Sequence, residues 1–277
     1  MNARRFGLII VGDEILSGRR QDKHLAKVIE LLAARGLALS WARYVGDDRP
    51  AITAALRDAF AGGDIVFSCG GIGATPDDHT RQCAAAALGV PLELHAGARV
   101  LIEERMRDVA REQGLPFEPG RPDNLHRLNM GTFPRGADLV PNPYNKIPGF
   151  SVGDVHFVPG FPVMAHPMIE WLLDGRYASL HGSHAQLERS VVVFGAMESA
   201  LTPLMERLEA AHAGLKVFSL PSVDHPVHGR HIELGVKGRG AAVEAAFAEL
   251  RQALLSDGYT LGPESSRGGD ATVAPAA

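Results

Sequence analysis

The sequence predicts an α/β fold, namely a doubly wound and mostly parallel sheet, followed by a small α+β domain. Apolar runs typical of buried strands alternate three times with patterns of helical period in the first third of the chain. Such alternation is typical of a parallel sheet covered by helices on both faces. Further along, a second set of strand and helix patterns has about the size of a small domain.

Three β-α units open the chain. They are strand 6–11 with helix 22–35, strand 37–45 with a helix opened by Pro50, and strand 65–68 with helix 80–88. Leu25, Val28, Ile29 and Leu32 recur at helical spacing in the first unit, and Pro50 suits the first turn of a helix. Because Gly36 and Gly89 directly follow two of these patterns, we expect them to end the helices.

The middle of the chain is richer in loops. A long polar helix is expected over 96–113, and proline and glycine then become dense from 115 to 162. This stretch holds short apolar runs at 139–140 and 155–158, each closed by a proline turn. Pro162 is expected to open the next helix, so the first domain is predicted to span residues 1–178.

The second domain is predicted over residues 186–262. Its expected elements are strand 190–194, helix 199–213, strand 216–220, strand 231–236 and helix 241–255. This order is a β-α-β-β-α layer. Residues 263–277 are rich in glycine, serine, alanine and proline and are predicted to form a flexible tail.

Composition excludes several classes of protein. Of the 277 residues, 45% are hydrophobic and 22% charged, which is ordinary for a globular protein, and the net charge of −4 gives no basic field for nucleic acid or an anionic membrane. The apolar run near the N-terminus is too short for a signal segment or a membrane span, so a cytoplasmic protein is expected. Cys69 and Cys83 are too few for a disulfide framework and are interpreted as buried fillers, with a reactive Cys69 as the alternative.

A glycine-rich loop at residues 70–80 links the third strand to its helix and ends in two carboxylates, Asp77 and Asp78. Glycines let backbone amides approach phosphate oxygens, and a helix N-terminus favours an anion. Two aspartates would repel a bare phosphate, but a divalent cation bridging carboxylate and phosphate removes the conflict. The loop therefore predicts a phosphate-containing ligand bound together with a metal ion, most simply Mg²⁺.

Carboxylates also follow the other two strands, as Gly12-Asp13-Glu14 and Gly46-Asp47-Asp48. Ligands of open parallel sheets bind at the carboxyl ends of the strands, so these acids are expected on one rim. Each aspartate is alternatively a simple helix cap, Asp48 above all. Because each site offers two adjacent acids, we expect Asp78, Asp47 and Glu14 to hold the metal, and Asp78 and Asp47 to be catalytic.

Common phosphate-binding motifs do not match the loop. It lacks the Lys-Ser/Thr pair that closes a P-loop, and Pro76 stands where a dinucleotide fingerprint needs its third glycine. No histidine and acid are identifiable as partners of Ser17, Ser68 or Thr75, which disfavours a serine hydrolase. The residues alone thus indicate an unspecified nucleotide or phosphate binder.

Five ordered blocks resemble a known family. They are GDEILSG at 12–18, VGDD at 45–48, GGIGATPDDHT at 70–80, PNPYNKIPGF at 141–150 and VPGFPVMAHPM at 158–168. Together they resemble the MoaB/Mog molybdopterin-binding domain, in the form found at the N-terminus of competence/damage-inducible protein A. The segment 188–255 is similar to the small second domain of that family.

The resemblance implies a set of ligand contacts around the rim. In addition to Asp47 and Asp78, these are Gly12, Asp13, Glu14, Ser17, Gly70, Gly71, Gly73, Thr75, Asp77 and Thr80, faced by Asn142, Pro143, Lys146, Pro148, Gly149 and Pro159 to Pro162, including Gly160. Two departures from the family pattern are Ala74, where a proline is usual, and the bulkier turn 144–147. Lys146 either neutralises a phosphate or is a solvated loop lysine.

The resemblance also implies function. The leading hypothesis is a divalent-metal-dependent hydrolase of a nucleotide diphosphate such as ADP-ribose. One alternative is a protein that binds molybdopterin or transfers an adenylyl group to it. The other is a non-catalytic nucleotide-binding module. A homo-oligomer is implied, and the deamidase activity of longer relatives is expected to be absent because the chain ends at residue 277.

Two groups of basic residues fall outside these blocks. The segment 225–231 contains His225, His228 and His231 and is either a metal site or a group of neutral surface histidines, the second being favoured because the segment lacks a cysteine or carboxylate ligand. Arg19 and Arg20 follow the first ligand loop and are either a phosphate clamp or an exposed basic pair.

Overall fold

The structure is a computed structural model that describes residues 4–182 and 187–268. Contacts between Cα atoms divide the chain into two compact units, with the division between His181 and Gly182. None of the helices in these two ranges is both long and apolar enough to cross a membrane.

The first unit is built on a sheet that has six strands within residues 4–182, in the order β2-β1-β3-β8-β7-β6. These strands are β1 (Phe6–Val11), β2 (Leu39–Val45), β3 (Ile65–Cys69), β6 (Asp138–Val140), β7 (Gly149–Val152) and β8 (Val155–Val158). The strands from β2 to β8 run parallel, and β7 and β6 are antiparallel additions. The predicted doubly wound and mostly parallel sheet is confirmed.

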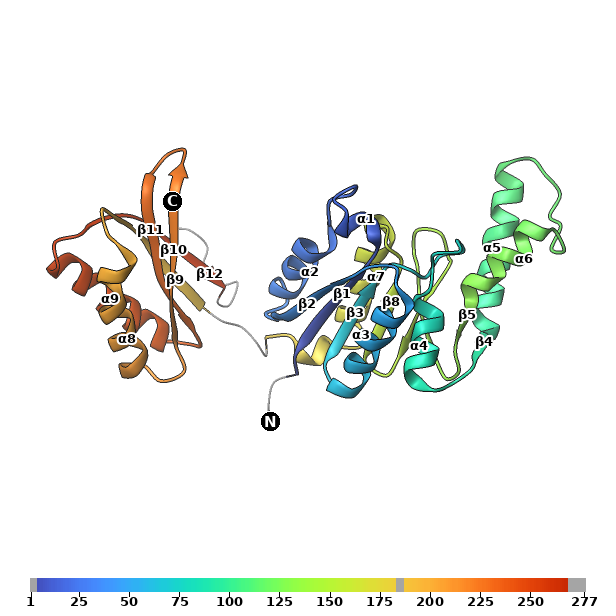
Figure 1. Ribbon diagram of the computed structural model, residues 1–277, viewed down its shortest axis with the longest axis horizontal. Helices are drawn as coiled ribbons and strands as arrows, with labels where there is room; N and C mark the ends of the chain where they lie inside the picture. Colours follow the sequence, from blue (N-terminus) through green and yellow to red (C-terminus); the bar gives the residue numbers. More distant parts are fainter. Residues whose placement is uncertain (1–3, 183–186, 269–277) are drawn as a thin grey trace. The chain divides into compact units, whose positions relative to one another are not determined.

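Helices cover both faces of this sheet (Figure 1). They are α1 (Asp13–Leu16), α2 (His24–Ala33), α3 (Arg49–Gly62), α4 (Thr80–Leu88) and α7 (Pro162–Asp174). Helices α2 and α7 pack in one hydrophobic core and α3 and α4 in another, on the opposite side. Both cores include buried residues of β1 and β3, because successive side chains of a strand point to opposite faces.

Strand β8 shows why the loop-rich middle of the chain was only partly predicted. All four of its residues are buried, and it pairs with β3 inside the sheet. A run of four apolar residues between glycines and prolines carries little periodicity, so the sequence indicated an apolar run but not an interior strand.

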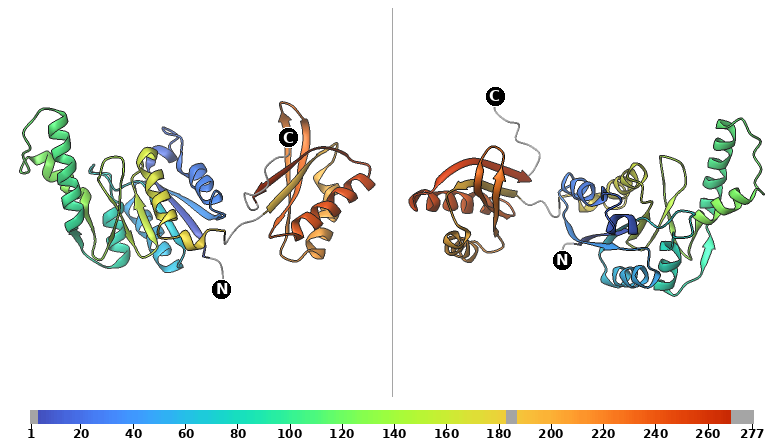
Figure 2. Two further views of the ribbon diagram at one scale, coloured as in Figure 1. Left: turned by 180° about the vertical axis from the view of Figure 1, so that it is seen from behind. Right: turned by 45° about the horizontal axis from the view of Figure 1, so that its top comes forward.

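An arm extends from the end of the first unit, and Figures 1 and 2 show it from several sides. It consists of β4 (Leu92–Leu94), α5 (Ala96–Glu112), α6 (Pro122–Leu128), the 3₁₀ turn η1 (Asn129–Gly131) and β5 (Thr132–Pro134). Strands β4 and β5 pair with each other. A further 3₁₀ turn, η2 (Ala178–Leu180), follows α7.

The second unit is a four-stranded antiparallel sheet in the order β10-β11-β9-β12, described over residues 187–268. Its elements are β9 (Leu187–Phe194), α8 (Glu198–Ala211), β10 (Lys216–His225), β11 (Gly229–Gly238), α9 (Ala242–Ser256) and β12 (Thr260–Gly268). Apolar residues of both helices and of the sheet form its core.

Strand β12 corrects the predicted tail. Residues 263–268 belong to a strand that pairs with β9, for example through Ser265 opposite Ser190. The segment was misread because it is polar and mostly exposed, as suits an edge strand, so no apolar alternation marks it. The rest of the predicted tail, residues 269–277, lies outside the described residues.

Candidate functional site: a glycine-loop cleft with an acidic rim

A cleft of about 520 Å³ lies beside the carboxyl ends of β1, β2, β3 and β8. The strand order reverses on either side of β1, the position at which open α/β sheets bind ligands. The lining includes fourteen of the predicted site residues, namely Gly12, Glu14, Asp47, Gly70, Gly71, Gly73, Thr75, Asp77, Asp78, Asn142, Pro148, Pro159, Gly160 and Phe161.

Two glycines allow the β3–α4 loop to turn sharply. Gly70 and Gly71 have φ angles of 104° and 69°, in the region that L side chains rarely adopt. A Cβ atom at Gly70 would overlap the carbonyl oxygen of Val11, and one at Gly71 would overlap the hydroxyl of Thr80. The backbone here is therefore packed too closely for any side chain.

Two buried side chains, Thr80 and Arg81, hydrogen-bond to the backbone of the loop. The Thr80 hydroxyl donates to the Gly70 carbonyl at 3.0 Å, and the buried Arg81 guanidinium donates to the carbonyls of Ile72 and Gly73 at 3.1 and 2.6 Å. Burial lowers the pKa of Arg81, whereas the charge of Asp78 opposes this shift. Thr80 thus supports the loop from outside the cleft lining, and Arg81 is a support that the sequence analysis missed.

Asp78 closes the loop on its exposed side. One oxygen, Oδ2, accepts hydrogen bonds from the Thr75 amide at 2.8 Å and from the Thr75 hydroxyl at 2.5 Å. This turn is a local feature of the kind aspartates make with backbone amides two or three residues away. Asp78 therefore has a structural role in addition to its place in the lining.

Asp47 and Asp13 connect the first two strand ends. Asp47 Oδ2 accepts from the Asp13 amide at 2.9 Å, and Asp13 Oδ1 accepts from the Asp47 amide at 3.1 Å. Burial raises the pKa of Asp47, and the negative charges of nearby acids raise it further, whereas the Asp13 amide opposes the shift. Those acids are Asp13, Glu14 and Asp77. Like charges thus gather at this rim, as predicted from the sequence.

The acids do not form a preorganised cage. Within the described ranges, no group of three or more histidine, cysteine, aspartate or glutamate side chains is placed to hold a metal ion. Mg²⁺ is usually bound by only one or two carboxylates together with waters and substrate phosphates. The carboxylates of Glu14, Asp47 and Asp78, which line the cleft beside the glycine loop, fit that manner of binding. Asp48, by contrast, caps α3 by accepting from the Ala51 amide at 2.9 Å.

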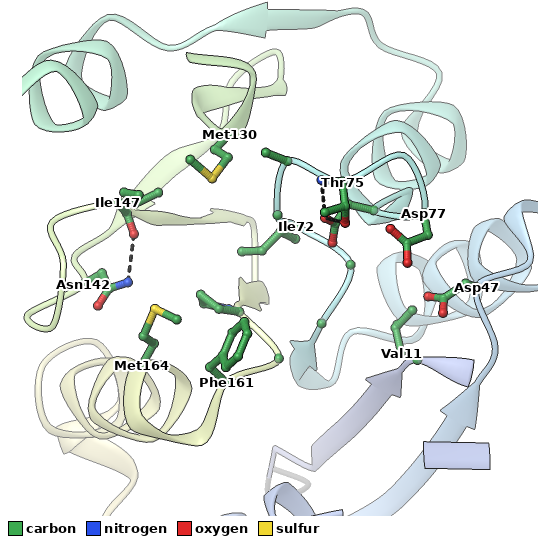
Figure 3. A pocket seen from close by; sticks show the side chains of 18 of the residues that line it. Val11, Asp47, Ile72, Thr75, Asp77, Met130, Asn142, Ile147, Phe161 and Met164 are labelled. Carbon is green, nitrogen blue, oxygen red and sulfur yellow. Dashed lines mark hydrogen bonds between the residues drawn. The ribbon is translucent and has the colours of Figure 1, made fainter. Parts of the chain in front are cut away.

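The wall opposite the loop is organised by Asn142. Its buried amide nitrogen donates to Asn145 Oδ1 and to the Ile147 carbonyl, at 2.8 and 2.9 Å, and its oxygen accepts from the Tyr144 amide. Figure 3 shows Asn142 and Ile147 across the cleft from Asp47 and Asp77. The carbonyl of Gly160, on the same wall, lies 3.0 Å from Nε2 of the buried His24.

Seven predicted residues lie outside the described cleft lining: Asp13, Ser17, Thr80, Pro143, Lys146, Gly149 and Pro162. Lys146 Nζ instead lies 2.7 Å from Asp108 and 3.8 Å from Glu104, both on α5. Its interpretation as a phosphate neutraliser is not supported by this placement. Gly149 is buried in β7, and Ser17 is exposed at the end of α1.

Several lining residues were not predicted as contacts. They are Val11, Ile72, Ala74, Met130, Asn145, Ile147 and Met164. Most lie inside the recognised sequence blocks, but their side chains, apolar except for Asn145, gave no functional signal. Met130 lies in no block and reaches the cleft only because the arm folds back through η1. Of the basic pair, Arg20 lines the cleft and Arg19 does not.

Two other candidates are explained by packing. Burial raises the pKa of Cys69 above its ordinary value, so the thiol stays protonated and its interpretation as a filler is favoured over a reactive one. Rings of His225, His228 and His231 pack together, with His225 Nδ1 accepting from the His228 amide and His231 Nδ1 lying 2.9 Å from the Gly229 carbonyl. Backbone groups thus occupy ring nitrogens that a metal would need.

The fold and cleft define an α/β domain of the molybdopterin-binding type. The family model described as "Probable molybdopterin binding domain" matches residues 7–178, well over half of the chain. The chain therefore belongs to this MoaB/Mog family, and it is similar to CinA-like proteins.

Relatives support this assignment. A CinA-like protein of Anaeromyxobacter sp. (strain Fw109-5) is 34% identical over 248 residues, covering 86% of this chain and 56% of the relative. A protein of Pyrobaculum arsenaticum is 32% identical over 222 residues, covering 77% of this chain and 78% of the relative. The chain thus spans just over half the length of the CinA-like relatives of Anaeromyxobacter.

A solved structure agrees with the fold. The crystal structure of "the protein CinA with unknown function" from Thermoplasma acidophilum has a TM-score of 0.52 and 27% identity. The match covers 62% of this chain and 98% of that chain.

Proposed function

We propose that the chain is a divalent-metal-dependent hydrolase of a nucleoside diphosphate derivative such as ADP-ribose. The observation that carries the proposal is the juxtaposition, in one cleft, of the glycine loop with the carboxylates of Glu14, Asp47 and Asp77. The glycine loop allows backbone amides to approach a phosphate closely, whereas the acidic rim repels a bare phosphate. A metal ion between the carboxylates and the phosphate reconciles the two features.

The chain's own residues supply binding and positioning. Gly71 and Gly73 line the cleft, and their backbone amides would donate to pyrophosphate oxygens. Hydrogen bonds of Arg81 and Asp78 support the conformation of the loop. Glu14, Asp47 and Asp78 would hold the metal. A bound Mg²⁺ would polarise the phosphoryl group and neutralise developing charge when water attacks.

The direct test is hydrolysis of ADP-ribose by purified protein with Mg²⁺. We expect AMP and ribose 5-phosphate in equal amounts, with water consumed and no product in EDTA. Glu14→Gln is the sharpest variant because no hydrogen bond of the Glu14 side chain supports the described fold, unlike those of Asp47 and Asp78. We expect it to lower kcat/KM at least tenfold by weakening the metal site.

The matched control is Glu206→Gln, which makes the same substitution at an exposed position on α8 in the second unit. It is expected to leave hydrolysis unchanged. Absence of AMP from the wild-type reaction across Mg²⁺, Mn²⁺ and Co²⁺ would contradict the proposal.

A second candidate is binding or adenylylation of molybdopterin, favoured by the description of the matched family. The same loop would hold the nucleotide phosphates, and the apolar lining residues Met130, Ile147 and Met164 would face the pterin. Loss of molybdoenzyme activity on deletion of the gene would support it, and normal cofactor levels would count against it. Tight nucleotide binding without turnover would instead favour a non-catalytic module.

A further inference from the structure

The cleft is chemically divided along its length. Asp47 and Asp77 lie at one end, beside Thr75 of the glycine loop, whereas Met130, Ile147 and Met164 lie toward the other (Figure 3). A ligand that fills the cleft must therefore present a charged group to the acidic end and an apolar surface to the other. A free phosphate or pyrophosphate has no part that matches the apolar end.

A second cavity of about 120 Å³ continues from the apolar end. It shares Met130 and Ile147 with the main cleft, so the two spaces adjoin at these side chains. The rest of its wall belongs to the arm, where Ile102, Met106 and Val109 project from α5. Ile102 and Met106 are buried, so the apolar base of this cavity is part of the packed interior of the arm.

Two arginines, Arg105 and Arg127, complete the lining. Each already has a partner: Arg105 Nη1 donates to Glu112 at 2.9 Å, and Arg127 Nη1 donates to Asn124 at 3.0 Å and lies 3.9 Å from Asp123. Their charges are partly compensated by these acids, so the cavity is not built to attract a second phosphate. A guanidinium plane held in this way can still stack on a flat ring or donate to ring nitrogens.

We propose that this arm cavity is a base-binding subsite that accepts the purine ring of the nucleotide, with the diphosphate directed toward the glycine loop and the acidic rim. The proposal rests on the function proposed above and adds where the nucleoside end is recognised. Apolar and methionine side chains suit a planar aromatic ring, and the arginines supply contacts to its face and edge. The arm would then determine which nucleotide is bound, and the acidic rim would carry out the hydrolysis.

The test separates the base from the phosphates by using ADP and inorganic pyrophosphate as probes, each titrated calorimetrically into the full chain with Mg²⁺. In Val109→Phe, the phenyl ring of the new side chain should occupy the arm cavity. We expect it to weaken ADP binding at least tenfold and to leave pyrophosphate affinity within twofold. Val100→Phe is the matched control, because it makes the same change at an exposed position on the same helix and should alter neither affinity.

A second variant does not depend on how the helix tolerates a phenylalanine. Arg127→Met removes a guanidinium that lines the cavity and should weaken ADP binding at least threefold without affecting pyrophosphate binding. Arg111→Met, at an exposed arginine of α5, should change neither affinity. Unchanged ADP binding by both folded cavity variants would overturn the subsite. Equal loss of ADP and pyrophosphate would also overturn it, and failure of wild-type protein to bind either probe would refute the proposed function itself.

Discussion

At the scale of single residues, His156 of β8 is a buried histidine outside the described cleft lining. His156 is fully buried, with Nδ1 2.6 Å from Ser151 Oγ and Nε2 2.6 Å from the Tyr177 hydroxyl, which donates to Asp154 at 2.8 Å. The series resembles a catalytic relay in composition. Because Ser151 and His156 are both buried and outside the described cleft lining, we interpret it as a structural network.

This network predicts acid sensitivity. Burial, reinforced by the charge of Arg176, lowers the pKa of His156 to about 3, against about 6.5 in an unfolded chain. The unfolded state therefore binds the proton first, so the free energy of unfolding falls as pH drops from about 6.5 toward about 3, by up to about 1.4 kcal/mol per pH unit from this group. Denaturant unfolding at several pH values measures the slope.

His156→Gln should flatten that slope, although the variant is less stable at pH 7 because it loses ring contacts and hydrogen bonds. The control is His126→Gln, at an exposed position on α6, which should keep the wild-type slope. An unaltered slope in His156→Gln would show that another group dominates the acid response.

At the scale of elements, local motifs were predictable and distant partners were not. The β3–α4 loop and the paired acids are read directly from consecutive residues such as Gly70, Gly71 and Asp78. His24 and Met130 reach the site through folding over long stretches of chain, and isolated histidines and methionines carry no periodic signal. Strand β12 was missed for a related reason, since its sequence is that of a polar loop.

Arg189 forms ion pairs that connect strand β12 with the rest of the second unit. From β9 it pairs with Glu244 of α9 at 2.6 Å and with Glu264 of β12 at 3.2 Å, and its guanidinium lies over the ring of Phe247. Its side chain is 22% exposed, so solvent screens these charges only in part. We expect Arg189→Met to lower the free energy of unfolding of the second unit by about 1 kcal/mol.

A denaturation curve followed by exchange protection of β9 and β12 amides would measure this effect. Arg230→Met, an exposed arginine on β11, provides the comparison and should be neutral. If both variants unfolded like the wild type, the ion pairs of Arg189 would have no net role in holding β12.

At the scale of the whole molecule, the chain combines an α/β unit that contains the cleft with a smaller α+β unit. All the described cleft residues belong to the first unit. The overall fold class was predictable because strand and helix patterns alternate three times over residues 6–88 of the first unit. The cytoplasmic location and the homo-oligomer implied by the family resemblance stay predictions.

The central claim is that rim carboxylates and ligand phosphates share one metal ion. Binding of a shared ion must be mutually enhanced, because the effect of metal on ligand affinity equals the effect of ligand on metal affinity. Titration of Mn²⁺ followed by electron paramagnetic resonance, with and without ADP, measures this coupling directly. We predict that ADP tightens Mn²⁺ binding at least tenfold and that Glu14→Gln reduces the enhancement; equal ADP affinity in Mn²⁺ and in EDTA would contradict the account.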